Sequence, residues 1–216
     1  MLTPLSRKDI FSQSPVADGM IAEVQGFYAR GFDEAVPEEL EVLNRLYDHR
    51  QVLQPGNKAP QAEAILTLRA RTRSGYARRF PKALQGFLEQ LGCRHLYLLD
   101  WLAFSWQEFP FETADKAATF SRLAQGRLEP GGFLLEIRQL SRLLPLFFFS
   151  GRFDGPVIYL IAAEGLPLSL QLCDDGNLHL AFHEQDRPAL EAAASQAGLL
   201  LGGDEVCFVY YTQKLT

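Results

Sequence analysis

The sequence predicts an α+β fold: a helical N-terminal part followed by a mainly antiparallel sheet with helices packed on one face. Up to Gly92 the apolar residues recur at helical spacing. Beyond Gly92, short apolar or alternating segments indicate strands that follow one another closely enough to pair as a meander. We therefore divide the chain into a mainly helical part, residues 1–92, and an α+β part, residues 93–216, joined in one compact unit.

Three helices are expected before Gly92. The first begins at Pro37, because proline suits the first helical turn and the acids that follow it favour the positive end of a helix. The second is expected from Gln61 to Thr72 and the third from Pro81 to Leu91. Gly92 then stands where a left-handed C-cap is typical.

The middle of the chain mixes both element types. The apolar and partly aromatic segment Leu96–Leu99 predicts a strand. Thr113 is a typical N-cap for a helix from Ala114 to Gln125. The apolar spacing of residues 133–144 predicts an amphipathic helix that ends at Pro145.

A hairpin is the clearest local structure of the last third. It follows an interior strand at Val157–Ile161 and is formed by two alternating segments, Leu166–Cys173 and Asn177–His183. A three-residue loop with Gly176 left-handed places the apolar residues of both strands on one face. That register pairs Leu172 with Leu178, Leu170 with Leu180 and Leu168 with Phe182.

One more helix and one more strand complete the expected sheet. Asp186 and Pro188 begin a helix that runs from Arg187 to Ala197. The segment Glu205–Tyr211 is apolar on both faces, which is typical of a buried strand.

Composition excludes several classes of protein. Of the 216 residues, 47% are hydrophobic and 22% charged, which is incompatible with a disordered chain. No uninterrupted apolar run reaches the roughly 18 residues of a membrane span, and charged residues break the apolar start of a secretory signal. The three cysteines form no CxxC pair, so we expect a cytoplasmic protein without a disulfide framework.

The charge is unevenly distributed along the chain. Six cations and no acid lie between Arg69 and Lys82, whereas from Phe153 onward nine acids face two cations, a net charge of −7. The Arg69–Lys82 run could contact nucleic-acid phosphates, could serve as an internal counter-surface for the acidic C-terminal part, or could simply be solvated. Because the rest of the chain is acidic, we do not expect nucleic acid to be the main partner.

Motifs that carry chemistry are largely missing. There is no GxSxG, SxxK or HExxH motif and no Walker-type loop. We do not expect Cys93 and His95 to act as a catalytic pair. His179, His183 and Cys173 could bind zinc, but a fourth ligand is not evident. We therefore expect no catalytic residue, metal or cofactor, with His179 and His183 on a polar sheet face.

An aromatic cluster favours a protein partner. Five aromatic residues fall between Trp101 and Phe111, close to acids, as in many binding hot spots, although a core role is the alternative. We select six candidate contacts for their charge or aromatic character: Trp101, Trp106, Glu108, Asp174, Asp175 and Glu184.

Two stretches resemble the SMI1/KNR4-like (SUKH) superfamily. Leu88-Glu89-Gln90-Leu91-Gly92 is similar to the end of that family's first helix, and residues 131–160 are similar to its helix followed by a proline and a glycine-preceded strand. The resemblance implies an immunity protein, since many bacterial members neutralise toxins by binding them.

These observations lead to a ranked set of functions. The leading hypothesis is a non-catalytic, cytoplasmic protein-binding protein of the bacterial toxin-immunity type. The alternative is an enzyme or small-ligand-binding protein whose site has no recognisable motif. The third is a nucleic-acid-associated protein that uses the Arg69–Lys82 run.

Overall fold

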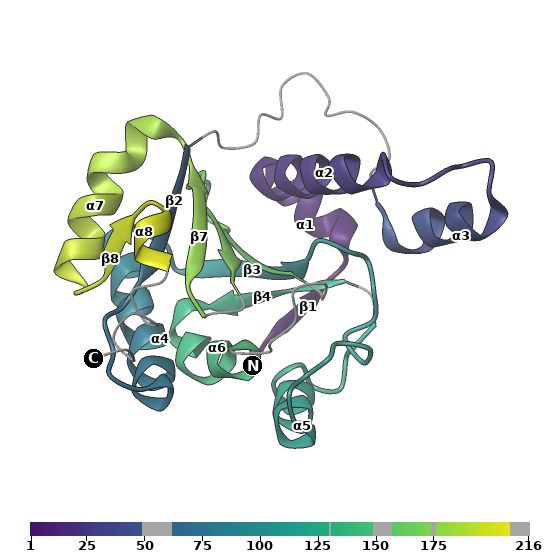
Figure 1. The fold of residues 1–216 in the computed structure, drawn as a ribbon. Helices are drawn as coiled ribbons and strands as arrows, with labels where there is room; N and C mark the ends of the chain where they lie inside the picture. Colours follow the sequence, from purple (N-terminus) through teal and green to yellow (C-terminus); the bar gives the residue numbers. More distant parts are fainter. Residues whose placement is uncertain (49–61, 130, 149–156, 174–175, 208–216) are drawn as a thin grey trace.

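A computed structural model describes residues 1–48, 62–129, 131–148, 157–173 and 176–207, and Figure 1 draws its fold. The described strands form one eight-stranded sheet in the order β1-β4-β3-β5-β6-β7-β2-β8, with neighbours antiparallel. They are β1 (Thr3–Leu5), β2 (Ala62–Thr67), β3 (His95–Asp100), β4 (Gly132–Glu136), β5 (Ile158–Ala162), β6 (Ser169–Leu172), β7 (Leu178–Phe182) and β8 (Leu200–Gly202). The α+β fold class predicted from the sequence is confirmed.

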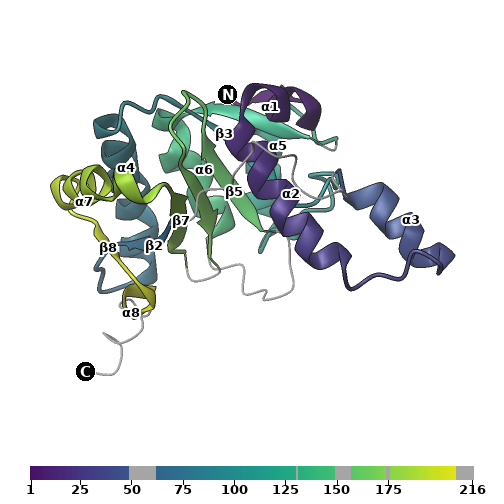
Figure 2. The same ribbon diagram turned by 90° about the horizontal axis from the view of Figure 1, so that it is seen from above.

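Helices cover the sheet on both faces. The larger core joins the strands to α4 (Arg73–Gln90), α6 (Leu140–Phe147) and α7 (Arg187–Gln196). On the opposite face α1 (Arg7–Gln13) and α2 (Pro15–Ala29) pack against β3 and β5 through Ile10, Ala17 and Ile21. Figure 2 shows α2 crossing over β5, with α3 (Pro37–Leu46) and α7 at opposite ends of the molecule. The α1–α2 layer adds a second covered face that the sequence did not predict.

Four further elements complete the described part of the chain. They are α5 (Ala114–Leu123), the 3₁₀ turns η1 (Ile137–Gln139) and η2 (Glu184–Asp186), and α8 (Asp204–Cys207). No helix of the described part is long and apolar enough to span a membrane.

Several local predictions are confirmed. Helix α3 begins at Pro37, and α5 begins after Thr113, whose hydroxyl accepts the N–H of Lys116. Gly92 follows the end of α4 with a φ of 75°. The β6–β7 register pairs Leu172 with Leu178, and Gly176 has a φ of 87°.

The helix predicted from Gln61 to Thr72 is wrong, because residues 62–67 form β2. This strand lies between β7 and β8, and only Glu63 of its six residues is exposed. Pairing on both edges and burial on both faces outweigh the helix propensity of its alanines and leucine. Thr72 instead caps α4, and Ser74 and Gly75 belong to the first turn of that helix.

The helix predicted over residues 133–144 is also wrong in its first part. Residues 132–136 form β4, which pairs with β1 and β3, and the helix α6 begins only at Leu140. Pro145 lies inside α6 rather than at its end.

The final strand predicted at Glu205–Tyr211 is not found where the structure describes this segment. Residues 205–207 belong to α8, while residues 208–211 lie outside the described residues. The strand at this edge of the sheet, next to β2, is instead β8, which precedes the predicted segment in the sequence.

The division at residue 92 does not separate two folding units. The N-terminal part supplies β1 and β2 to the common sheet, and α4 packs on its larger core.

Candidate functional site

Four of the six predicted contact residues lie in the described part of the chain, and no hydrogen bond, ion pair or ring contact joins any two of them there. Trp101 is partly exposed after β3, and Glu108 is exposed in the following loop. Glu184 is exposed before α7, where its carboxylate binds Arg187 at 2.6 Å. Asp174 and Asp175 lie outside the described residues. Their selection, like that of Trp101, Glu108 and Glu184, stays a prediction.

Trp106 is a core residue, so its selection as a partner contact is wrong. Its side chain is 2% exposed, and its indole N–H donates to the carbonyl of Gly131 at 3.2 Å. The ring packs against Phe120 and Phe133, and the core interpretation of the cluster also holds for Phe104 and Phe109.

Trp101 belongs instead to an aromatic surface that the sequence analysis missed. Its ring contacts Tyr28 with centroids 4.7 Å apart and Tyr47 at 5.8 Å. Tyr28 contacts Phe27, and Tyr47 contacts Phe32, so five rings form one continuous chain of contacts. We call this set, Phe27, Tyr28, Phe32, Tyr47 and Trp101, the aromatic surface.

The outer end of the aromatic surface is open to solvent. Phe27 is 66% exposed and Tyr28 is 51% exposed, and apart from Met1 they are the most exposed large hydrophobic residues of the described part. The sequence offered a signal for this arrangement. Two adjacent aromatic residues on α2 point about 100° apart, so both cannot face the same core.

A buried polar network holds Trp101 in place. The guanidinium of Arg7, on α1, donates to Asp48 at 2.7 Å and to the carbonyl of Asp100 at 2.8 Å. The amide of Gln25, on α2, donates to the carbonyl of Trp101 at 2.6 Å and to Asp48 at 3.2 Å. Because Arg7 and Gln25 are buried, this network ties α1, α2 and the end of α3 to the segment that carries Trp101.

The surroundings of the aromatic surface are acidic. Residues 18–48 contain eight acids and two arginines, a net charge of −6. Glu23, Asp33, Glu34 and Glu38 are all exposed. The negative field of these acids attracts a cationic partner. Added salt screens this attraction and therefore weakens the binding.

Asp100 is the unusual group of this region. It is 1% exposed; one carboxylate oxygen accepts the N–H of Leu102 at 2.7 Å, and the other has no hydrogen-bond partner. Burial raises the pKa of Asp100 to about 8, although the Leu102 N–H and Arg7 act in the opposite direction. The carboxyl is therefore mainly protonated at neutral pH.

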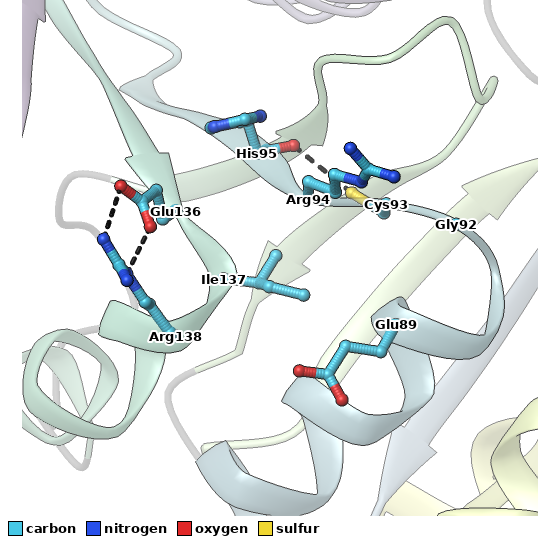
Figure 3. Close-up of a pocket in the computed structure, with 8 residues that line it drawn as sticks. All are labelled: Glu89, Gly92, Cys93, Arg94, His95, Glu136, Ile137 and Arg138. Atoms are coloured by element: carbon cyan, nitrogen blue, oxygen red, sulfur yellow. Dashed lines mark hydrogen bonds and ion pairs between the residues drawn. The ribbon is translucent and has the colours of Figure 1, made fainter.

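A separate pocket of about 450 Å³ lies at the start of β3, between the end of α4 and η1. Figure 3 shows its lining residues, in which the ring of His95 points away from Cys93. Across the pocket Arg138 binds Glu136 through both carboxylate oxygens. The close Cys93–His95 side-chain pair considered from the sequence is not formed.

Cys93 is also poorly suited to act as a nucleophile. The thiol is buried and donates to the carbonyl of His95 at 3.2 Å. Burial and the nearby carboxylate of Glu164 raise the pKa of Cys93 to about 12, so the reactive thiolate is scarce at neutral pH.

His95 binds a carboxylate that comes from the end of β5. Its Nδ1 lies 2.6 Å from Glu164, whose other oxygen accepts the backbone N–H groups of Arg94 and His95. These hydrogen bonds lower the pKa of Glu164 against the opposing effect of its burial. The His95–Glu164 pair links the β5–β6 connection to the start of β3. Among the described lining residues, no serine, threonine or accessible thiol lies beside this pair.

No group of three potential ligands in the described part is arranged to hold a metal ion. This includes His179, His183 and Cys173, the set considered for zinc. His179 faces the polar side of the sheet opposite Gln171, and its Nε2 is buried without a hydrogen-bond partner.

Comparison with family models, curated proteins and solved structures finds no match to this chain. The similarity to the SUKH superfamily therefore remains a prediction that rests on the two sequence stretches named above.

Proposed function

We propose that this protein is a non-catalytic binding protein whose partner is a cationic protein. One observation carries the proposal: Phe27 and Tyr28 are exposed, they are continuous with Trp101, and they lie within an acidic segment. Large exposed aromatic groups are costly in water and supply most of the energy at binding hot spots.

The chemistry of the aromatic surface indicates the kind of partner. Aromatic faces bind arginine and lysine side chains through cation–π contacts, and the surrounding carboxylates add long-range attraction. A basic patch with protruding arginines matches both features. The Arg7–Asp48–Gln25 network, in which Arg7 and Gln25 are buried, supports this role because it holds the Trp101 end of the surface in one position before binding.

The resemblance to SUKH proteins extends the proposal to a bacterial toxin as the partner and to the cytoplasm as the place of action. In that case binding covers the basic active surface of the toxin.

The test uses the full-length protein as bait in a lysate of its native host. A basic protein should be retained at low salt and released as salt rises. Phe27→Ser/Tyr28→Ser should reduce its retention at least tenfold, and Glu38→Gln/Glu41→Gln should weaken it at low salt. The matched control Glu89→Gln/Glu191→Gln removes the same charge far from the aromatic surface and should leave retention unchanged.

The results separate the two levels of the proposal. Failure to retain a basic protein, or equal retention by all variants, would contradict the binding function. A retained partner whose enzymatic activity survives saturation with this protein would contradict the immunity role alone.

A further inference from the structure

The basic run between Arg69 and Lys82 forms an exposed surface on the side of the sheet opposite the aromatic surface. Its second half lies on α4, which packs on the larger core, whereas the aromatic surface includes α2 on the other face (Figure 1). We use the name basic face for five exposed cations of this run: Arg71, Arg73, Arg78, Arg79 and Lys82.

The described part of the chain shows no ion-pair partner for most of the basic face. Arg71, Arg78, Arg79 and Lys82 form no ion pair within the described part of the chain. Three of the C-terminal acids are likewise not paired with these cations: Glu164 binds His95, Glu184 binds Arg187, and Glu191 faces solvent. The acids Asp154, Asp174 and Asp175 lie outside the described residues.

Of the two longer helices that pack beside α4, α6 adds positive charge, whereas α7 exposes Glu191. Helix α6 packs beside α4, contains no acid and exposes Arg142. The first turn of α4 likewise contains no acid, although acids are the residues that favour a helix N-terminus. Helix α4 thus carries a positive N-terminal end and, further along, Arg78, Arg79 and Lys82, none of which forms an ion pair within the described part of the chain.

The residue types suit a phosphate ligand. Four of the five cations are arginines, whose planar guanidinium donates two parallel hydrogen bonds to a phosphate. Arg78 and Lys82 lie one helical turn apart, so they can contact a repeating backbone together. A polyanion that approaches this side meets the helical layer rather than the acidic segment of α2 and α3.

We propose that the basic face binds the phosphate backbone of a nucleic acid without reading its sequence. This inference does not depend on the proposed function, because the two surfaces share no residue.

The probe is a fluorescent mixed-sequence DNA duplex of about 20 base pairs, with binding followed by anisotropy. If four cations contact phosphates, affinity should fall about a hundredfold between roughly 50 and 200 mM salt. Arg78→Gln/Lys82→Gln should weaken binding at low salt and reduce the slope of log K against log salt by about 2, at about 0.9 per phosphate contact. Lys8→Gln/Arg127→Gln removes two exposed cations elsewhere and should leave that slope unchanged.

Thermal melting of each variant checks that the fold is retained. The inference would be overturned by absence of binding at low salt, or by equal losses in the test and control variants. Displacement of the duplex by an equal charge concentration of polyglutamate would also overturn it, because the basic face would then favour an acidic protein.

Discussion

At the scale of single residues, the most informative group is a carboxyl that the fold keeps away from water. Asp100 ends β3 with one oxygen hydrogen-bonded and the other without a partner. Its pKa of about 8 lies far above the ordinary 3.8, mainly because burial disfavours the charged form. Between these two values the folded protein binds a proton that the unfolded chain has lost. The contribution of Asp100 to stability is therefore fully present below about pH 3.8 and is lost as the pH rises toward 8.

We expect Asp100→Asn to remove this pH dependence. The asparagine cannot ionise, and its carbonyl oxygen can still accept the N–H of Leu102. Relative to the variant, the wild type should lose at most about 1.4 kcal/mol of unfolding free energy per pH unit between pH 4 and 8. Urea denaturation at several pH values measures the difference, with exposed Asp115→Asn as the control. Parallel curves for wild type and Asp100→Asn would contradict the assignment.

At the scale of elements, one glycine determines how closely α1 approaches the sheet. A Cβ at Gly132, the first residue of β4, would lie 2.5 Å from the end of Ile10 and 2.8 Å from the carbonyl oxygen of Leu98. The Leu98 oxygen belongs to the paired strand β3 and cannot move freely. The bare backbone at this position is therefore needed for α1 to pack on the sheet.

Gly132→Ala should destabilise the protein by about 1–3 kcal/mol, because overpacking forces side chains and backbone to shift. The matched control should change the stability in the opposite direction. Gly86 lies within α4 with nothing near its missing Cβ, so Gly86→Ala should stabilise by up to about 1 kcal/mol. Chemical denaturation of the two variants measures both effects, and a neutral Gly132→Ala would show that α1 can move without cost.

Elements whose signals are local could be predicted from the sequence. The β6–β7 register follows from the alternation of leucines on both sides of a glycine turn, and α5 follows from Thr113. Strands β2 and β4 could not be predicted, because their partners lie far along the chain and their short apolar segments also fit a helix.

The candidate site was predicted only in part, for the same reason. Trp101 stood out within an aromatic cluster, but nothing local distinguishes it from buried Trp106. Its neighbours Phe27, Tyr28, Phe32 and Tyr47 come from residues 27–47, and the fold brings these residues to Trp101 through contacts that are remote in sequence.

At the scale of the whole molecule, the sheet joins both halves of the sequence. Strand β1 pairs with β4, and strand β2 lies between β7 and β8. The N-terminal part therefore supplies the strand at one edge of the sheet and the strand next to the other edge. Helix α4 also fills the larger core with Tyr76, Phe80 and Phe87.

We therefore expect residues 93–216 expressed alone not to fold. Without β2, strand β8 loses its only partner among the described strands, and the larger core loses the buried side chains of α4. Circular dichroism should show no cooperative thermal transition for this fragment, whereas the full chain should show one. A cooperative melt of the fragment would mean that the C-terminal part is an autonomous domain.

The position of β2 has a consequence for biosynthesis. Leu66 pairs with Leu178, which the ribosome adds 112 residues later. At about 5–20 residues per second, β2 emerges roughly 6–22 s before its first partner exists. During that interval an almost wholly apolar strand is available to chaperones or to other nascent chains. Slower translation of the second half should therefore lower the yield of native protein.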